Sequence, residues 1–136
     1  MKAFIAYRFS GEDPKIIEPA LTAVRDGLNF QKIDSYCTFF NDLPDRDKNG
    51  TAKAIMLHAF KEIEQSDFLF VLQTSEAKSE GMLMEVGYCL AKQIPIVVAN
   101  CRGVRSSYIH LLANKHFDWE DVLDLTDKTA NLDYSF

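Results

Sequence analysis

The stretch Asp67-Phe-Leu-Phe-Val-Leu72 decides the fold class, because it is apolar on both faces of an extended chain. Side chains of a strand point alternately to opposite faces, so a strand without polar alternation must be covered on both sides. Such strands are typical of parallel sheets, whose faces are covered by crossover helices. Ile94–Ala99 has the same character, and the segment from about Gly81 to Lys92 between the two strands is predicted to be a helix.

The rest of the chain repeats this alternation. We predict further strands at Lys2–Tyr7 and Ile33–Phe40 and a short last strand at His116–Trp119. Further helices are predicted from Pro14 to near Gly27, after a capping Thr51, and over Arg105–Asn114. A kink or a later start is expected for the first helix because of Pro19, and a brief acidic helix or turn and a loose tail are expected after Trp119. The pattern predicts one α/β domain over residues 1–136, with a central, mainly parallel sheet of five strands between helical layers.

Ligands of open parallel sheets bind outside the carboxyl ends of the strands, where the strand order switches. This rule directs attention to four loops, at residues 7–12, 40–50, 73–81 and 99–104. We therefore expect one cleft, formed where some of these loops meet.

Composition limits the classes of partner. The chain has a net charge of −5 and no Lys- or Arg-rich run, which argues against a nucleic-acid polymer or a membrane surface as partner. A small anionic ligand needs only a local cluster of donors and stays possible. The apolar start of the chain is too short for a signal-peptide core and no run approaches a membrane span, so we expect a cytoplasmic protein.

The cysteines and histidines do not form a recognisable metal or disulfide pattern. The three cysteines are scattered, and Cys37 and Cys89 lie in apolar runs, so they are predicted to be buried, inert thiols. His58, His110 and His116 lack ligand-like spacing. Residues 45–50 match the start of an EF-hand loop, but Met56 stands where the bidentate carboxylate belongs, so a polar loop is predicted. No metal or cofactor is expected.

The segment Ser79–Tyr88 holds the strongest candidate residues. Ser79 is a plausible N-cap and Gly81 would let a ligand approach the backbone amides, which form an anion site at a helix start. Glu85 lies among apolar residues about one turn into the helix, where desolvation would suit its carboxylate to nucleophilic or acid–base work. A simple capped helix with a solvent-facing glutamate is the alternative. Gly87, inside the same helix, favours close packing or ligand approach.

Gly81-Met-Leu-Met-Glu85-Val-Gly-Tyr88-Cys-Leu-Ala91, followed by Ile94-Pro-Ile-Val-Val98, resembles the signature of the nucleoside 2-deoxyribosyltransferase superfamily. That group includes the deoxynucleoside 5′-monophosphate N-glycosidases. The resemblance covers nearly the whole chain and implies a flavodoxin-like (Rossmann-like) three-layer sandwich. Its specific core is Met84-Glu-Val-Gly-Tyr88.

The resemblance implies that Glu85 attacks the anomeric carbon of a nucleoside or nucleoside 5′-monophosphate, and that water or a second base resolves the glycosyl–enzyme ester. Ser79, six residues before Glu85, would hold a 5′-phosphate. Tyr7, Arg8 and Ser10 would line the pocket, where the planar fork of Arg8 suits a phosphate. The resemblance also implies a homo-oligomer, to which the aromatic tail Leu132–Phe136 would contribute.

One position departs from this family. Its members usually carry an Asp eight residues before the Asp that opens the third strand, and the corresponding residue here is Ala59. His58 and Glu62 are nearby but do not occupy the same place on the helix, and the acidic loop with Asp42, Asp45 and Asp47 is a possible substitute.

A second resemblance lies at Phe4-Ile-Ala-Tyr7-Arg8-Phe-Ser10-Gly-Glu-Asp13, which is similar to the opening of a TIR domain. Some TIR domains cleave NAD with a helical glutamate, a role that Glu85 would fill. Three functions are therefore open: a deoxyribosyltransferase-like N-glycosidase, a TIR-like NAD-cleaving enzyme, and a non-catalytic nucleotide-binding or signalling module. The first is favoured.

Overall fold

The strand β3 (Phe68–Gln73) lies at the centre of the sheet, and all of its residues are buried. The computed structural model describes residues 1–41, 51–104 and 108–136 of the chain. Within these residues five strands pair in the order β2-β1-β3-β4-β5, and every pair is parallel. The other strands are β1 (Lys2–Tyr7), β2 (Asp34–Tyr36), β4 (Ile96–Cys101) and β5 (Lys115–Trp119). The predicted parallel sheet is confirmed.

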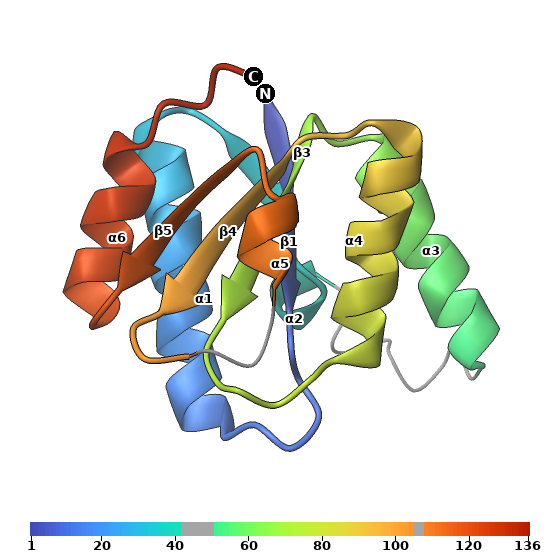
Figure 1. Ribbon diagram of the computed structural model, residues 1–136, viewed down its shortest axis with the longest axis horizontal. Helices are drawn as coiled ribbons and strands as arrows, with labels where there is room; N and C mark the ends of the chain where they lie inside the picture. The colour runs from blue at the N-terminus through green and yellow to red at the C-terminus, as the bar shows by residue number, and fades with distance from the viewer. Residues whose placement is uncertain (42–50, 105–107) are drawn as a thin grey trace.

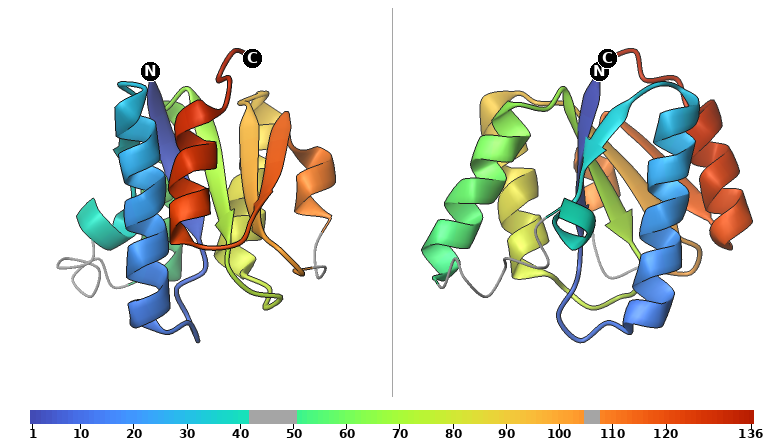
Figure 2. Two further views of the ribbon diagram at one scale, coloured as in Figure 1. Left: turned by 90° about the vertical axis from the view of Figure 1, so that its left-hand side faces the viewer. Right: turned by 180° about the vertical axis from the view of Figure 1, so that it is seen from behind.

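Helices cover both faces of this sheet (Figure 1 and Figure 2). One layer holds α1 (Pro14–Phe30) and α6 (Val122–Asn131). The other holds α3 (Ala52–Glu64), α4 (Glu80–Lys92) and the short α5 (Ile109–Leu112). A single turn, α2 (Thr38–Asn41), follows β2. No helix within the described ranges combines the length and the apolar character needed to cross a bilayer.

The alternation of side chains along each strand divides the core into two clusters. Ala3, Ile5 and Tyr7 of β1 face α1 and α6, whereas Phe4 and Ala6 face the layer of α3 and α4. Both clusters are apolar throughout, which is why β1 and β3 carry hardly any polar residue. The strands are apolar on both faces because each face of the sheet packs against a layer of helices.

Two boundaries on the α1 side differ from the sequence prediction. Helix α1 does not stop at Gly27 but runs to Phe30, and Asp13 caps its start through the amide of Lys15. The helix therefore begins at Pro14 despite Pro19. A Cβ on Gly27 would lie only 2.7 Å from Cβ of Thr129, so this glycine permits close contact between α1 and α6.

The predicted strand Ile33–Phe40 is also shorter than expected. The extended segment ends at Tyr36, and the chain turns at once into α2. The side chain of Asn41 accepts a hydrogen bond from the amide of Cys37 (3.1 Å), which fixes this turn. Residues 42–50, which include the predicted polar loop, its acidic residues and the EF-hand-like segment, lie outside the described residues.

The carboxyl-terminal part is more ordered than predicted. The brief acidic helix is the ten-residue α6, which starts at the capping Asp121. The tail is not loose: Tyr134 is buried, stacks on Phe68 and donates a hydrogen bond to the carbonyl of Thr129 (2.8 Å). Phe136 also packs against Phe68. The tail thus packs on its own sheet while Phe136 stays half exposed, and both the homo-oligomer and the part of the tail in it stay predictions.

The helix predicted over Arg105–Asn114 is described only in part, since residues 105–107 lie outside the described residues and α5 covers Ile109–Leu112. Strand β4 starts at Ile96 rather than at Ile94. Helix α4 ends in a left-handed residue, Gln93 (φ 58°), and Pro95 then delays the pairing of the strand. These shifts leave the order of elements unchanged.

Candidate active site

A cavity of about 480 Å³ lies at the carboxyl ends of β1 and β3. The chain leaves β1 toward β2 on one side and later returns to β3 on the other, so this is the switch point of the strand order. Of the four predicted loops, those after β1 and β3 line this cavity. All six residues predicted for the site contribute to its wall: Tyr7, Arg8, Ser10, Ser79, Gly81 and Glu85.

Helix α4 presents Glu85 to this cavity. Ser79 caps the helix by accepting a hydrogen bond from the amide of Met82 (3.2 Å), as its sequence position predicted. Met82, Val86 and Cys89 are the buried residues of α4, so the helix turns that stripe to the sheet. Glu85 lies beside this stripe and is only partly exposed.

Burial changes the acidity of this carboxyl group. Desolvation raises the pKa of Glu85 from an ordinary glutamate value to about 8. Within the described residues its carboxylate has neither a hydrogen bond nor an ion pair, so no positive group offsets the cost of burying the charge. Burial is the main cause of the raised pKa of the Cys37 and Cys89 thiols, and the negative charge of Glu85 adds to it at both. The group is therefore mostly a neutral acid at pH 7 in the free protein.

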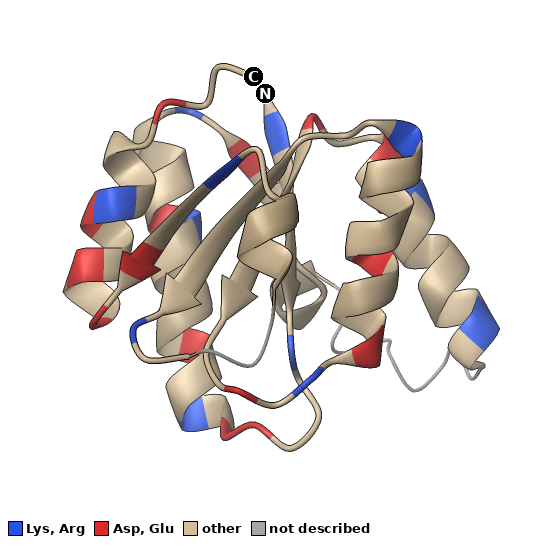
Figure 3. Cartoon of the chain, in the orientation of Figure 1, with Lys and Arg blue, Asp and Glu red and all other residues tan. Residues whose placement is uncertain are grey.

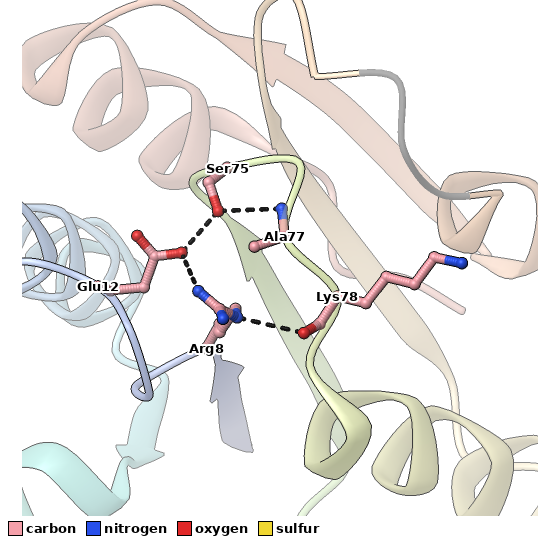
Figure 4. Close-up of polar contacts among 5 residues, drawn as sticks. All are labelled: Arg8, Glu12, Ser75, Ala77 and Lys78. Atoms are coloured by element: carbon pink, nitrogen blue, oxygen red, sulfur yellow. Dashed lines mark hydrogen bonds and ion pairs between the residues drawn. The ribbon is translucent and has the colours of Figure 1, made fainter.

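The guanidinium of Arg8 is held at the edge of the cavity by a polar network (Figure 4). Nη1 donates to Oε1 of Glu12 (3.0 Å), and Nε donates to the carbonyl of Lys78 (3.2 Å). The same Glu12 oxygen accepts a hydrogen bond from the hydroxyl of Ser75 (2.6 Å). These bonds tie the loop after β1 to the loop after β3. They also occupy part of the fork of Arg8, so a phosphate bound there would compete with Glu12.

Tyr7 is positioned at the end of β1 by contacts with α2. Its hydroxyl lies 3.1 Å from the hydroxyl of Thr38, and its ring makes an edge contact with Phe39. Thr38 itself lines the cavity. The short helix α2, which replaces the end of the predicted strand Ile33–Phe40, therefore contributes to the wall and orients an aromatic residue.

Ala59 lines the same cavity and is almost fully buried. The position at which the resembling family carries an Asp thus faces the cavity, and here it brings a methyl group instead of a carboxylate. Ile55 and Met56, four and three residues earlier on α3, lie on the same face and also line the wall. The helical spacing from Ala59 is the sequence feature that would have predicted Ile55 and Met56 as residues of the wall.

No family model matches the sequence, and no curated protein matches it. Similar solved structures do exist. A 2-deoxyribosyltransferase from Bacillus psychrosaccharolyticus matches with a TM-score of 0.71 at 18% identity, covering 98% of this chain and 93% of the other. The fold is the flavodoxin-like one.

Two further structures have the same flavodoxin-like architecture. The CMP N-glycosidase BcmB from Clostridium botulinum matches with a TM-score of 0.62 at 14% identity, over 94% of this chain and 96% of its own. A conserved protein from Enterococcus faecalis V583 matches with a TM-score of 0.68 at 18% identity, over the same shares. At these identities the similarity establishes the fold. The neighbours thus include a 2-deoxyribosyltransferase and a CMP N-glycosidase.

Both glycines of α4 have open space beside them, Gly81 toward the cavity and Gly87 toward solvent. A Cβ on Gly81 would meet no atom within 4 Å, so the open space beside the start of the helix belongs to the cavity. Gly87 also has no neighbour within 4 Å, and it is exposed. The reading of Gly87 as a close-packing position is therefore wrong. Tyr88 points to α3, where it stacks on Phe60 (ring centroids 4.2 Å apart) and donates to Glu64.

The cysteines and the other histidines are the remaining chemical candidates among the described residues. Cys37 and Cys89 are buried and free, and burial raises the pKa of each thiol to about 12, so the prediction of buried thiols is confirmed. His110 and His116 have their rings 5.7 Å apart and line a second cavity of about 270 Å³ beside Asn100. Asn100 belongs to the fourth predicted loop region, which therefore does not join the main cavity.

The raised pKa of Glu85 predicts a pH-dependent effect on stability. The neutral form is favoured in the folded state, so the wild type loses stability as pH rises from about 4.5 to about 8, where the folded but not the unfolded chain holds the proton. Glu85→Gln cannot lose a proton. We expect it to match the wild type at pH 4.5 and to exceed it by on the order of 1–2 kcal/mol above pH 8, after discounting for partial exposure.

Urea unfolding at several pH values measures this difference. Glu76→Gln is the matched control, because Glu76 is exposed and has no partner among the described residues. Its unfolding free energy should follow that of the wild type across the range. A constant difference between Glu85→Gln and the wild type from pH 4.5 to 9 would contradict the raised pKa.

Proposed function

We propose that the chain cleaves or transfers the N-glycosidic bond of a nucleoside or nucleoside 5′-monophosphate, with Glu85 as the nucleophile. The observation that carries this proposal is a desolvated carboxylate on the wall of a cavity of about 480 Å³. Such cavities have the size of small-molecule sites. The neighbours named as a 2-deoxyribosyltransferase and a CMP N-glycosidase support the same class of reaction.

The electrostatics of Glu85 suit attack on a sugar. A carboxylate that has lost its water shell and lacks a cationic partner is a stronger nucleophile than one in bulk water. The transition state of glycosidic cleavage carries positive charge on the sugar, which favours the ionised form of a nearby carboxylate. The rate of base release should therefore increase from neutral pH toward pH 8, as Glu85 ionises.

The cavity offers groups for a small polar substrate. The start of α4, with Ser79 and Gly81, supplies backbone amides and a favourable dipole for the 5′ end of a sugar or its phosphate. On the other side of the cavity, the wall is formed by Tyr7, Arg8 and Ser10 at the end of β1 and in the loop that follows it. Lys and Arg are interspersed with Asp and Glu over the described residues rather than gathered into one patch (Figure 3), which favours a small molecule over a nucleic-acid polymer as partner.

The experiment is a substrate panel. The full chain is incubated separately with ribonucleosides, deoxynucleosides, the 5′-monophosphates of both, and NAD, and released base is separated by chromatography. We expect release from at least one nucleoside or its monophosphate, and a product bearing a second base when that base is added identifies transfer. Failure to release base from every nucleoside and monophosphate would overturn the proposal.

A non-catalytic nucleotide-binding module is the second candidate, and Ala59 is the observation that favours it. The cavity lacks the carboxylate that the resembling family places at this position of α3. Calorimetric titration with the same compounds separates the two candidates, since binding without release of base would favour the module. Release of nicotinamide from NAD alone would favour the TIR-like alternative.

The homo-oligomer and the cytoplasmic compartment are also proposals. The exposed apolar side chains of Leu83, Met84 and Leu90 on α4 and of Leu57 on α3 offer a better contact surface than the packed tail does. The cysteines of the described residues are free, as is usual in a reducing compartment.

A further inference from the structure

Among the described residues the cavity wall holds a nucleophile on α4, whereas Ala59 occupies the position on α3 where the resembling family carries an acid. When the bond between the anomeric carbon and the base nitrogen breaks, its electron pair stays on the nitrogen, and an ordinary base leaves readily only if that nitrogen is protonated. Ala59 cannot supply a proton. Another group on the wall has to do so if the reaction proceeds at a useful rate.

His58 is the neighbour of Ala59 on α3, and its side chain lines the same cavity. Nε2 of His58 lies 3.0 Å from the hydroxyl of Tyr36, and the two rings make an edge contact at 6.1 Å. A hydrogen bond to one ring nitrogen sets the orientation and the tautomer of an imidazole. The imidazole is therefore held by a defined partner at the cavity wall.

Tyr36 is itself fixed from two sides. Its ring stacks on Phe4 of β1 (centroids 5.6 Å apart), and the ammonium group of Lys2 lies 5.7 Å from its centroid. Tyr36 is nearly fully buried, although its hydroxyl reaches His58. A rigid, buried tyrosine can hold the imidazole in one orientation through its hydroxyl group, as hydrogen-bond partners of ligating histidines do in metal sites.

The charged groups around His58 come from several elements. Lys2 of β1 approaches from the side of Tyr36 and pairs with Glu62, one turn further along α3 (3.5 Å). Across the cavity, α4 presents Glu85 and Glu80. The remaining charged residues of the wall are Arg8 and Lys78. Glu85 and His58 thus face a shared cavity, the carboxyl group from α4 and the imidazole from α3.

We propose that His58 is the general acid for the departing base, in place of the family's absent carboxylate, and that Tyr36 positions it. This inference rests on the proposed function. In the step, a Glu85 carboxylate oxygen bonds to the anomeric carbon as the bond to the base nitrogen breaks. The electron pair of that bond stays with the base, the imidazolium of His58 gives the base nitrogen a proton, and His58 becomes neutral. In the second step the oxygen of a water molecule bonds to the anomeric carbon as the ester bond to Glu85 breaks. The electron pair of the ester bond returns to the Glu85 carboxylate, and the neutral imidazole takes a proton from the attacking water.

The test compares two kinds of leaving group on His58→Gln. A deoxynucleoside whose purine is methylated at N7 already carries a positive charge on the base, which departs neutral without taking up a proton. We expect His58→Gln to release an ordinary base about 100-fold more slowly than the wild type and the N7-methylated base less than about 5-fold more slowly. His116→Gln, in the second cavity, is the matched control and should release both at the wild-type rate.

The pH profile gives a second measurement. The wild type should show an alkaline limb, which reports loss of the proton that the acid donates, and His58→Gln should lack it. Tyr36→Phe keeps the ring but removes the hydroxyl, so we expect about a 10-fold slower release of an ordinary base with the alkaline limb shifted. A merely structural role of Tyr36 would slow both leaving groups equally and leave the limb in place.

The outcomes distinguish this inference from the proposed function. If His58→Gln releases the ordinary base at the wild-type rate, or slows both bases equally, the assignment of His58 is overturned while the function stands. If the wild type releases no base from any nucleoside, or if Glu85→Gln releases it undiminished, the proposed function fails and the inference falls with it.

Discussion

Glu85→Gln should lower the rate of base release by at least about 10³-fold while leaving the chain folded. Glutamine has nearly the same shape as glutamate, but its amide does not form a stable ester with the anomeric carbon. Because the carboxylate has no hydrogen bond or ion pair among the described residues, the substitution breaks no observed contact. Single-turnover measurements of released base, with the wild type and the variant at pH 8, give the ratio directly.

Glu76→Gln is the matched control, since it makes the same chemical change in the exposed loop before α4 and should release base at the wild-type rate. Glu85→Ala adds a second line of evidence, because the space it creates can admit azide or formate. Restoration of base release by either anion is expected for a lost nucleophile. Undiminished release by Glu85→Gln, with the fold intact by circular dichroism, would exclude Glu85 as nucleophile.

The sheet could be predicted because burial on both faces leaves a direct trace in the sequence. Strands β1 and β3 were located to within one residue from their unbroken apolar runs. The same signal failed for β2, where the apolar run continues through Phe40 but the chain turns after Tyr36. The backbone amides of Phe40 and Asn41 donate to the carbonyl of Cys37 (3.1 and 2.9 Å), and the side chain of Asn41 accepts from the amide of Cys37, so local hydrogen bonds outweigh the strand pattern.

The candidate site divides in a similar way. Ser79 and Glu85 lie on one helix, so their spacing and the N-cap pattern were enough to place both near the start of α4. The network around Arg8 could not be predicted from the sequence. Glu12, the partner of Arg8, also binds Ser75, which lies 63 residues away from Glu12 along the chain. The spacing of the histidines gives no sign of the role of His58, because His58 lies on α3 whereas its partner Tyr36 lies on β2.

The glycines show why a local cost does not reveal its cause. A glycine inside a helix lowers the stability of the helix by about 1 kcal/mol relative to alanine, whatever surrounds it. Gly87 was selected on this ground, and it proves to be open and exposed. Gly27 was read as a helix end, and it proves to be the contact point of α1 with α6. Only the packing of the two helices distinguishes these positions.

We expect Gly27→Ala to destabilise the chain by about 3 kcal/mol. The new Cβ would lie 2.7 Å from Cβ and 2.8 Å from Cγ2 of Thr129, and 2.9 Å from the backbone oxygen of Thr126. Because Cβ and a backbone oxygen cannot rotate away, α1 and α6 have to separate. That separation opens the core between them, where Leu28 and Leu125 are fully buried.

Gly87→Ala is the matched control, since it makes the same substitution inside another helix of the same protein. Its Cβ would meet no atom within 4 Å, so the change should only remove the helical cost of glycine and stabilise the chain by about 1 kcal/mol. Urea unfolding of both variants measures the two free energies. Opposite signs are expected because the helix propensity is the same at both positions, whereas the steric clash with α6 exists only at Gly27. If Gly27→Ala were also stabilising, the close contact between α1 and α6 would be refuted.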